Sequence, residues 1–325
     1  MRKKKGIFMI LAVTLLVFTA VVAVFLKGEI AQAGNDLEFE ANAQILMTEA
    51  VEDTEEVAVI KEVEKVEKSY IELYGLEEVD KPEKRTEEQI LLKIEELAEE
   101  YDMIREIYEN VDAYSIVMLD HLANNPEMAA YVLGALESDG SVTGTFTEAE
   151  LEAEFPLLLQ FDPRWGYFEY GGKEMGISGC GPTCLAMTIL ALTDVENVTP
   201  DKVAAYSLEN DYYVENVGTA WKLIDEFPTL FGLTVSNPGI NEELMKAELD
   251  KGNMLICSVR KGIFTAGGHF IVIYGYDETG FKVNDPMCVA RSNKTWTYAQ
   301  FGRQIKQIWS VGVKYEALSA SEMVR

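Results

Sequence analysis

Residues 177–184 read ISGCGPTC, and the apolar run LAMTILAL follows directly at residues 185–192. Together they predict a buried helix that begins beside Cys180, with Pro182 at the first helical position, where a missing N–H costs nothing. A helix N-terminus stabilises a thiolate, and the thiolate is the reactive form, so Cys180 is a candidate nucleophile. Cys184 lies one turn further along the same face, where we expect a buried structural thiol.

Histidine is scarce in this chain of 325 residues, which contains only His121 and His269. A cysteine-based site would therefore have to take its base from one of these two. His269 follows two glycines and opens an apolar strand, a place where glycine allows close backbone approach. We interpret His269 as the base, with a hydrogen-bonded core histidine as the alternative. His121 falls among predicted helices and is interpreted as an ordinary surface or partly buried histidine.

Asp285 is the candidate for orienting the imidazole, sixteen residues after His269. The segment from Asp277 to Gly280 is expected to turn two strands into a hairpin. The two side chains share a face if the connection is a bulged three-residue loop with Gly280 left-handed, whereas a strict two-residue turn places them on opposite faces. Asn284 is a competing orienter, and an Asp-Pro turn is the alternative role for Asp285.

Gln160, twenty residues before Cys180, is the candidate oxyanion donor. Its side-chain amide would act together with the Cys180 backbone N–H. Nucleophile, base, orienting acid and oxyanion donor are what cysteine acyl transfer requires, so the set predicts hydrolysis of an amide bond.

These residues lie in segments that resemble the peptidase C39-like family, which has a papain-like cysteine peptidase fold and the chain order Gln, Cys, His, Asp. The segments are Gln160–Trp165, Tyr170–Gly171, Ser178–Thr183, Gly218–Trp221, Gly232–Leu233, Gly268–Val272 and Asn284–Pro286. The resemblance covers about residues 155–312 and implies the same four roles for Gln160, Cys180, His269 and Asp285. Within this family, the chain resembles the free-standing, secreted or anchored proteins of Gram-positive bacteria, because no P-loop motif or multi-span membrane region is apparent.

The order of expected elements after residue 155 indicates an α+β fold. Helices are expected first and strands later, with the Cys-bearing helix packed on an antiparallel sheet that carries the histidine and the aspartate. The expected helices are 182–192, 200–207, 219–227 and 241–251, and the expected strands are 254–259, 269–276 and 280–283.

The N-terminus combines four basic residues, Arg2 to Lys5, with an uncharged and mostly apolar run, Gly6 to Phe25. At about 1.5 Å per residue, this run can cross a roughly 30 Å hydrocarbon core, and the charges keep the N-terminus in the cytoplasm. Ala31-Gln32-Ala33 offers a signal-peptide cleavage site as the alternative. Either reading places the body of the protein outside the cytoplasm, anchored by a single span or secreted.

A helical region is expected before the peptidase-like part. Thr86 and Gln89 form a capping box, and an apolar stripe from Ile90 to Val111 predicts one continuous helix. Two further helices are expected at 114–122 and, after Pro126, up to 136. The predicted organisation is a signal anchor or signal peptide (1–33), an acidic and partly disordered stalk (34–85), a helical region (86–137), a linker (138–154), a C39-like peptidase domain (155–315) and a tail (316–325).

The formal net charge of −27 argues against a nucleic-acid partner and weakens adhesion to anionic lipid. We interpret the acidic residues as keeping a protein outside the cytoplasm soluble. Recognition of a cationic partner is the alternative. The four cysteines, at 180, 184, 257 and 288, lack paired CxxC spacing, so we expect no zinc site, and no other cofactor is implied. The sequence does not decide whether a disulfide joins Cys184 to Cys257 or Cys257 to Cys288.

The function predicted from the sequence is an extracytoplasmic cysteine peptidase with a peptide or protein substrate. Two alternatives remain, and the first uses the same four residues. One is an amidase of peptidoglycan stem peptides, since papain-like folds host both activities. The other is a surface module that binds peptides without cleaving them.

Overall fold

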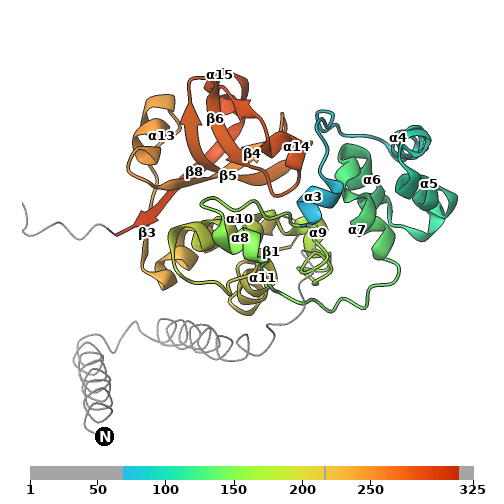
Figure 1. Ribbon diagram of the computed structural model, residues 1–325, viewed down its shortest axis with the longest axis horizontal. Coiled ribbons are helices and arrows are strands. Elements are labelled where there is room, and N and C mark those ends of the chain that lie inside the picture. Colours follow the sequence, from blue (N-terminus) through green and yellow to red (C-terminus); the bar gives the residue numbers. More distant parts are fainter. Residues whose placement is uncertain (1–68, 216, 315–325) are drawn as a thin grey trace, which may run out of the picture. The chain divides into compact units, whose positions relative to one another are not determined.

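The computed structural model describes residues 69–215 and 217–314. Every described residue belongs to one compact unit of the chain, drawn in colour in Figure 1. The predicted membrane segment, most of the predicted stalk and the tail at 316–325 lie outside the described residues. Among the residues that are described, no helix is both long enough and apolar enough to span a bilayer.

The peptidase-like part is built on an antiparallel sheet of six strands within the described residues, in the order β3-β8-β4-β5-β6-β7. The three strands expected from the sequence are present as β4, β5 and β6, and they lie side by side in this sheet. The strands are β3 (Leu233–Ser236), β4 (Met254–Arg260), β5 (Gly268–Asp277), β6 (Gly280–Asn284), β7 (Thr295–Trp296) and β8 (Ile305–Val313). A separate pair, β1 (Tyr213–Val214) and β2 (Gly218–Thr219), is antiparallel.

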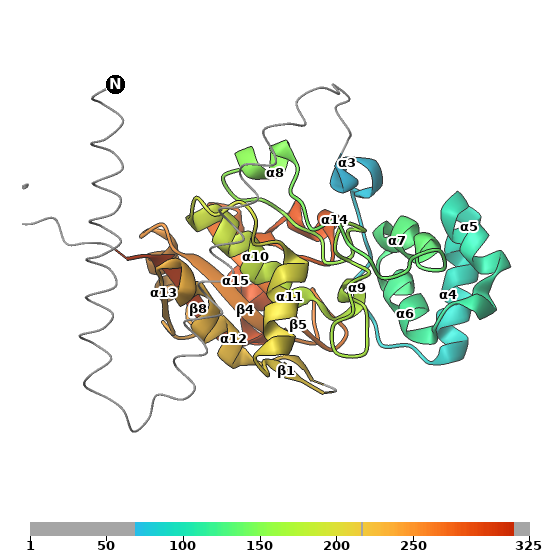
Figure 2. The same cartoon turned by 90° about the horizontal axis from the view of Figure 1, so that it is seen from below.

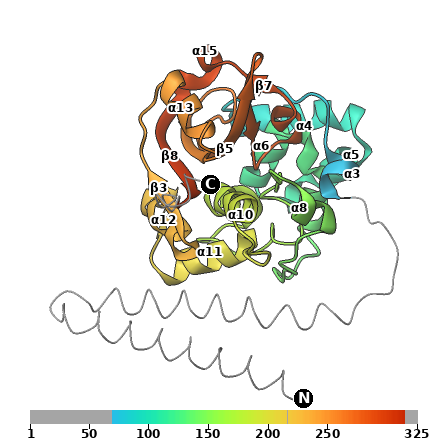
Figure 3. The same cartoon turned by 60° about the vertical axis from the view of Figure 1, so that its left-hand side comes forward.

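Helix α10 (Cys180–Leu192) packs against β4, β5 and β8 and is buried from Gly181 to Ile189. In Figures 1 and 3 it lies on the opposite side of the sheet from α13 (Glu242–Leu249) and α15 (Tyr298–Phe301). Met245 and Phe301 from these two helices pack with the β-strand side chains in one apolar cluster. The predicted α+β fold, with the Cys-bearing helix on an antiparallel sheet, is confirmed.

The start of α10 differs from the prediction by two residues. Gly179 is the N-cap and Cys180 is the first helical residue, so Pro182 occupies the third position and not the first. The proline is still tolerated there, because the N–H groups of the first turn have no partner within the helix.

The peptidase-like part contains further helices before α10, directly after it and between the strands. They are α8 (Glu148–Glu152), α9 (Met175–Ser178), α11 (Pro200–Glu209), α12 (Trp221–Glu226), the 3-10 helix η4 (Phe227–Phe231), α14 (Val289–Ser292) and the 3-10 helix η5 (Gly302–Gln304). The four helices expected from the sequence correspond to α10, α11, α12 and α13, with boundaries that differ by up to two residues.

The β5–β6 hairpin reaches the expected arrangement by a different route. Asp277 pairs with Gly280, so the hairpin closes through a two-residue loop and the expected three-residue loop is wrong. Such a turn alone would separate the two functional side chains. A bulge at Tyr274 in β5 shifts the pairing by one residue, however, and this returns Asp285 to the same face as His269.

In the structure the helical region also includes residues 69–85 of the predicted stalk, because Tyr70 and Ile71 pack against its core. Its helices are α3 (Tyr70–Tyr74), α4 (Glu87–Glu100), α5 (Asp102–Glu109), the 3-10 helix η2 (Val111–Ala113), α6 (Ile116–Asn124), the 3-10 helix η3 (Pro126–Met128) and α7 (Ala129–Gly134). The predicted capping box at Thr86 and Gln89 forms. The predicted single helix is wrong, because Tyr101 adopts an extended conformation (φ −117°, ψ 116°) and separates α4 from α5. The break lets Ile104 and Ile107 fold back into the core that contains Ile94, which a straight helix would overshoot.

The helical region shares its hydrophobic core with the peptidase-like part. Leu122 and Val132 belong to the same buried cluster as Phe161 and Val289. Figure 2 shows α6 and α7 close to α9 and α14. This continuous core means that the two regions are packed against each other.

The predicted linker at 138–154 contains the short helix α8. Thr147 caps this helix through a capping box, and Arg164 binds Glu150 through two contacts of 2.7 Å. Arg164 also contacts Asp162 at 2.7 Å, so the segment is attached to the surface of the peptidase-like part.

Candidate active site

Cys180 stands at the start of α10 and is the one cysteine of the four that is not buried. Burial raises the pKa of the Cys184, Cys257 and Cys288 thiols, which makes them poor nucleophiles. All four are free thiols, so neither of the two bridges left open by the sequence is present. Of the four thiols, only Cys180 is placed to meet a ligand from solvent.

The first turn of α10 lies against β2. A Cβ at Gly181 would come within 2.5 Å of the Thr219 hydroxyl, so a side chain there would displace the helix start. Thr219 is in turn bound by the Tyr170 hydroxyl at 2.9 Å. These contacts hold the first turn of α10, which carries Cys180, against β2.

His269 is buried at the start of β5, and its Nε2 lies 2.8 Å from Asp285 Oδ1. Burial alone lowers the pKa of the imidazole. The Asp285 charge and hydrogen bond, together with a side-chain hydrogen bond with Cys180, outweigh that effect and raise it to about 9. The protonated imidazole is therefore favoured beside the Cys180 thiol.

Asp285 is completely buried, and both of its carboxylate oxygens are engaged. Oδ1 accepts from His269 and from the Met287 backbone N–H, and Oδ2 lies 2.8 Å from Arg291 Nε. Burial raises the pKa of the carboxyl, but the charges of Arg291 and His269 outweigh it and lower the pKa below its usual value. Asn284, the competing orienter, instead donates to the backbone carbonyl of Pro156 at 3.0 Å.

Arg291 and Glu127 extend this network and were not identified from the sequence. Glu127, from the helical region, accepts the N–H groups of Val289 and Ala290 at 2.8 and 3.0 Å. These residues begin α14, the helix that carries Arg291. Glu127 also accepts the Leu76 N–H at 3.0 Å. A line of contacts therefore connects the helical region to the carboxylate that holds His269.

The sequence contains a signal for one of these two residues only. Arg291 directly follows the apolar residues 287–290, and a cation in such a run is a candidate for a buried ion pair. Glu127 lies among many acidic residues of a strongly acidic chain, and nothing local distinguishes it.

Gln160 is buried, and its backbone N–H donates to the Pro286 carbonyl at 2.8 Å, next to Asp285. Its side-chain Nε2 donates to the carbonyl of Gly176 at 3.0 Å and, with a longer contact of 3.4 Å, to that of Met175. Its Oε1 has no hydrogen-bond partner among the described residues. The predicted oxyanion donor thus lies in the wall of the site, with its amide turned toward these carbonyls.

A cleft of about 510 Å³ brings Cys180, His269 and Gln160 together. His121, expected to be an ordinary surface or partly buried histidine, is partly exposed and lines the same cleft. Its Nδ1 lies 2.9 Å from the Val117 carbonyl oxygen, and burial lowers the pKa of the ring. His121 is thus a wall residue that α6 contributes to the cleft.

The arrangement can perform nucleophilic acyl transfer. A thiol at a helix N-terminus, beside an imidazole that a buried carboxylate holds, matches the requirements for an activated nucleophile. Within the described ranges, no group of three or more His, Cys, Asp or Glu side chains is placed to bind a metal ion.

Comparison with known proteins gives one family and one solved structure. Residues 152–317 match the model of the Peptidase_C39 like family. The solved structure is the peptidase domain of Streptococcus ComA, described as a bi-functional ABC transporter involved in a quorum sensing pathway. It is 17% identical, the alignment covers 49% of this chain and 99% of that domain, and the TM-score is 0.37. No curated protein matches the chain.

Proposed function

This chain belongs to the Peptidase_C39 like family, and we propose that it is a cysteine peptidase that hydrolyses peptide bonds through a thioester on Cys180. The observation that carries the proposal is the placement of His269. Its ring is held by Asp285 at 2.8 Å, and it lines the same cleft as Cys180, the one cysteine of the four that is not buried.

In the first step, the thiol proton of Cys180 passes to His269, and the resulting thiolate sulfur attacks the carbonyl carbon of the scissile bond. Protonated His269 gives its proton to the leaving amine nitrogen, the C–N bond breaks, and a thioester remains. In the second step, His269 takes a proton from water as the water oxygen attacks the thioester, which releases the acid and restores the thiol. Because Asp285 occupies Nε2, Nδ1 is the ring nitrogen left for both proton transfers.

Gln160 is proposed to stabilise the oxyanion together with the Cys180 backbone N–H. Its amide has two N–H bonds, and the 3.0 Å contact with the Gly176 carbonyl uses one of them. The other would turn from the long 3.4 Å contact with Met175 toward the developing charge. Hydrogen bonds to an oxyanion in a site protected from water are among the strongest contributions to catalysis.

We further propose that the peptidase acts outside the cytoplasm on a peptide or protein. The support is the basic stretch Arg2 to Lys5 followed by the apolar run Gly6 to Phe25.

The proposal is tested first without a substrate. The full chain in detergent is treated with iodoacetamide between about pH 5 and 9, and each cysteine is mapped by mass spectrometry. We expect Cys180 to react fastest and His269→Ala to slow it, with buried Cys184 as the internal reference. Hydrolysis of a peptide library by the wild type, but not by Cys180→Ala, completes the test. Equal labelling of Cys180 in wild type and His269→Ala would contradict the proposed pair.

A further inference from the structure

The helical region forms one wall of the cleft that contains Cys180. Pro82 and Lys84 line the cleft together with His121 and Asn124 of α6. Asn124 Oδ1 accepts the Glu83 N–H at 2.8 Å, which fastens the segment around Lys84 to α6. A ligand that reaches Cys180 therefore lies between the helical region and the peptidase-like part.

The charge of this cleft is opposite to that of the chain. The whole chain has 28 basic and 55 acidic residues, yet the only carboxylate side chain that lines the cleft within the described residues is Asp120. Four basic side chains line it, namely Lys84, Lys173, Lys306 and Arg291. Burial raises the pKa of Asp120 from its usual value.

Three of the four cations are available to a ligand. Arg291 is buried and bound to Asp285. The lysines at 84, 173 and 306 are exposed and have no ion pair within the described part of the chain. The Lys306 ammonium lies 5.5 Å from the centre of the Trp221 ring, which is itself part of the cleft wall.

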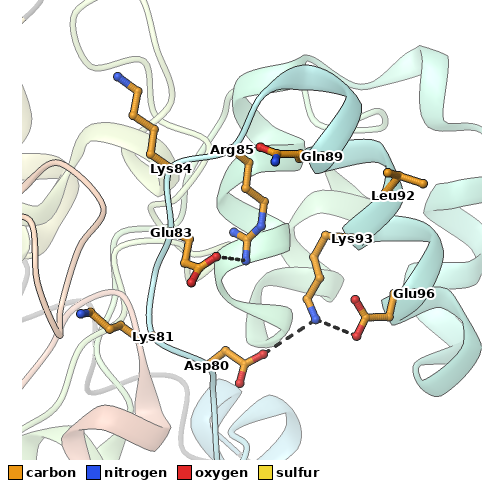
Figure 4. A pocket seen from close by; sticks show the side chains of 9 residues that line it. All are labelled: Asp80, Lys81, Glu83, Lys84, Arg85, Gln89, Leu92, Lys93 and Glu96. Carbon is orange, nitrogen blue, oxygen red and sulfur yellow. Dashed lines mark ion pairs between the residues drawn. The ribbon is translucent and has the colours of Figure 1, made fainter.

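A groove on the helical region differs from the cleft in the charges that line it. This groove of about 670 Å³ is lined by alternating charges that pair with one another, as Figure 4 shows. Lys93 contacts Asp80 at 3.8 Å and Glu96 at 3.1 Å. Lys84 borders both hollows, and in Figure 4 its side chain extends away from these ion pairs. Three carboxylates thus oppose four cations in the groove, whereas one carboxylate opposes four cations in the cleft.

We propose that the substrate is an acidic peptide, with Asp or Glu residues close to the scissile bond that are held by Lys84, Lys173 and Lys306. This inference rests on the proposed function. A cleft lined by one sign of charge concentrates ligands of the other sign, and screening over about 8 Å at physiological salt keeps distant acidic surface from cancelling the effect. Each exposed lysine–carboxylate contact is expected to change the rate about 2- to 5-fold.

The test uses the full chain in detergent and a dodecapeptide library in which one position at a time is fixed as Glu, Gln or Lys. We expect Glu peptides to be cleaved faster than the isosteric Gln peptides, with a ratio that falls as salt rises. Lys84→Gln, Lys173→Gln and Lys306→Gln should each lower this ratio about 2- to 5-fold. Lys246→Gln is the matched control, since Lys246 pairs with Glu242 at 2.8 Å outside the cleft and its loss should leave the ratio unchanged.

The outcomes separate this inference from the proposed function. Equal cleavage of Glu and Gln peptides, or preference for Lys, would overturn the acidic substrate and leave the peptidase in place. If no peptide is cleaved, the proposed function fails. Binding of the same peptides, labelled with tetramethylrhodamine, to Cys180→Ala then decides the inference by fluorescence anisotropy. Tighter binding of the Glu peptides would support it, and equal binding would overturn it.

Discussion

Replacing Glu127 by alanine should destabilise the protein although the residue lies in the helical region, outside the peptidase-like part. The carboxylate is 2% exposed and accepts three backbone N–H groups, from Leu76, Val289 and Ala290. Each buried donor that loses its acceptor costs about 1–3 kcal/mol. Three such losses, reduced by local relaxation and entry of water, give about 3–5 kcal/mol, a large part of the roughly 5–15 kcal/mol that stabilises a domain.

The measurement is urea unfolding followed by tryptophan fluorescence and circular dichroism. Glu127→Gln keeps the shape and one acceptor oxygen, so we expect it to lose about half as much, roughly 1.5–3 kcal/mol. Glu99→Ala removes an exposed carboxylate from α4 and is expected to change the free energy of unfolding by less than about 0.5 kcal/mol.

The same Glu127 variants test whether the loss of these hydrogen bonds also changes the active site. Glu127 holds the start of α14, and α14 carries the Arg291 that binds Asp285. At urea-free conditions where Glu127→Gln is folded, we expect slower alkylation of Cys180 and a lower apparent pKa for His269. A loss below about 1 kcal/mol in Glu127→Ala would refute the reasoning about buried donors. An unchanged His269 titration would refute the coupling to the site.

Three further predictions concern the site itself. The pKa of His269 is raised from 6.5 to about 9, so its contribution to stability is complete below pH 6.5 and is lost as the pH rises through 9. The free energy of unfolding in urea should fall over this window by at most about 3 kcal/mol, and by less in His269→Gln. Gln160→Ala should lower kcat about 10²- to 10³-fold with little change in KM, and an unchanged kcat would remove Gln160 from the oxyanion site. Arg291→Met leaves the Asp285 carboxylate buried without its cation, so we expect a loss of about 3–5 kcal/mol in urea unfolding and a higher pKa for Asp285. A double variant with Asp285→Asn should recover part of that stability, and an additive loss would contradict the pairing.

Local chemistry explains why much of the site could be predicted. Cys180 is identified by the glycine-rich stretch that precedes an apolar helix. The chain contains only two histidines, so only two residues could be the imidazole base. The pairing of His269 with Asp285 was predicted from hairpin spacing, and their 2.8 Å contact agrees with it. The reason given was wrong, since the loop has two residues and the Tyr274 bulge restores the face. A bulge arises from packing between strands, which local sequence does not report.

The sequence by itself determined the helix with Cys180 at its start, the α+β order of elements and the residues that could act as base and orienting acid. Each of these follows from short-range patterns of apolar residues, glycine and proline. Only the tertiary structure decided that α4 and α5 separate at Tyr101, that Glu127 binds the start of α14, and that the helical region lines the cleft. These features depend on contacts between residues up to 163 positions apart, such as Glu127 and Ala290, and such contacts form only when separate elements share one core.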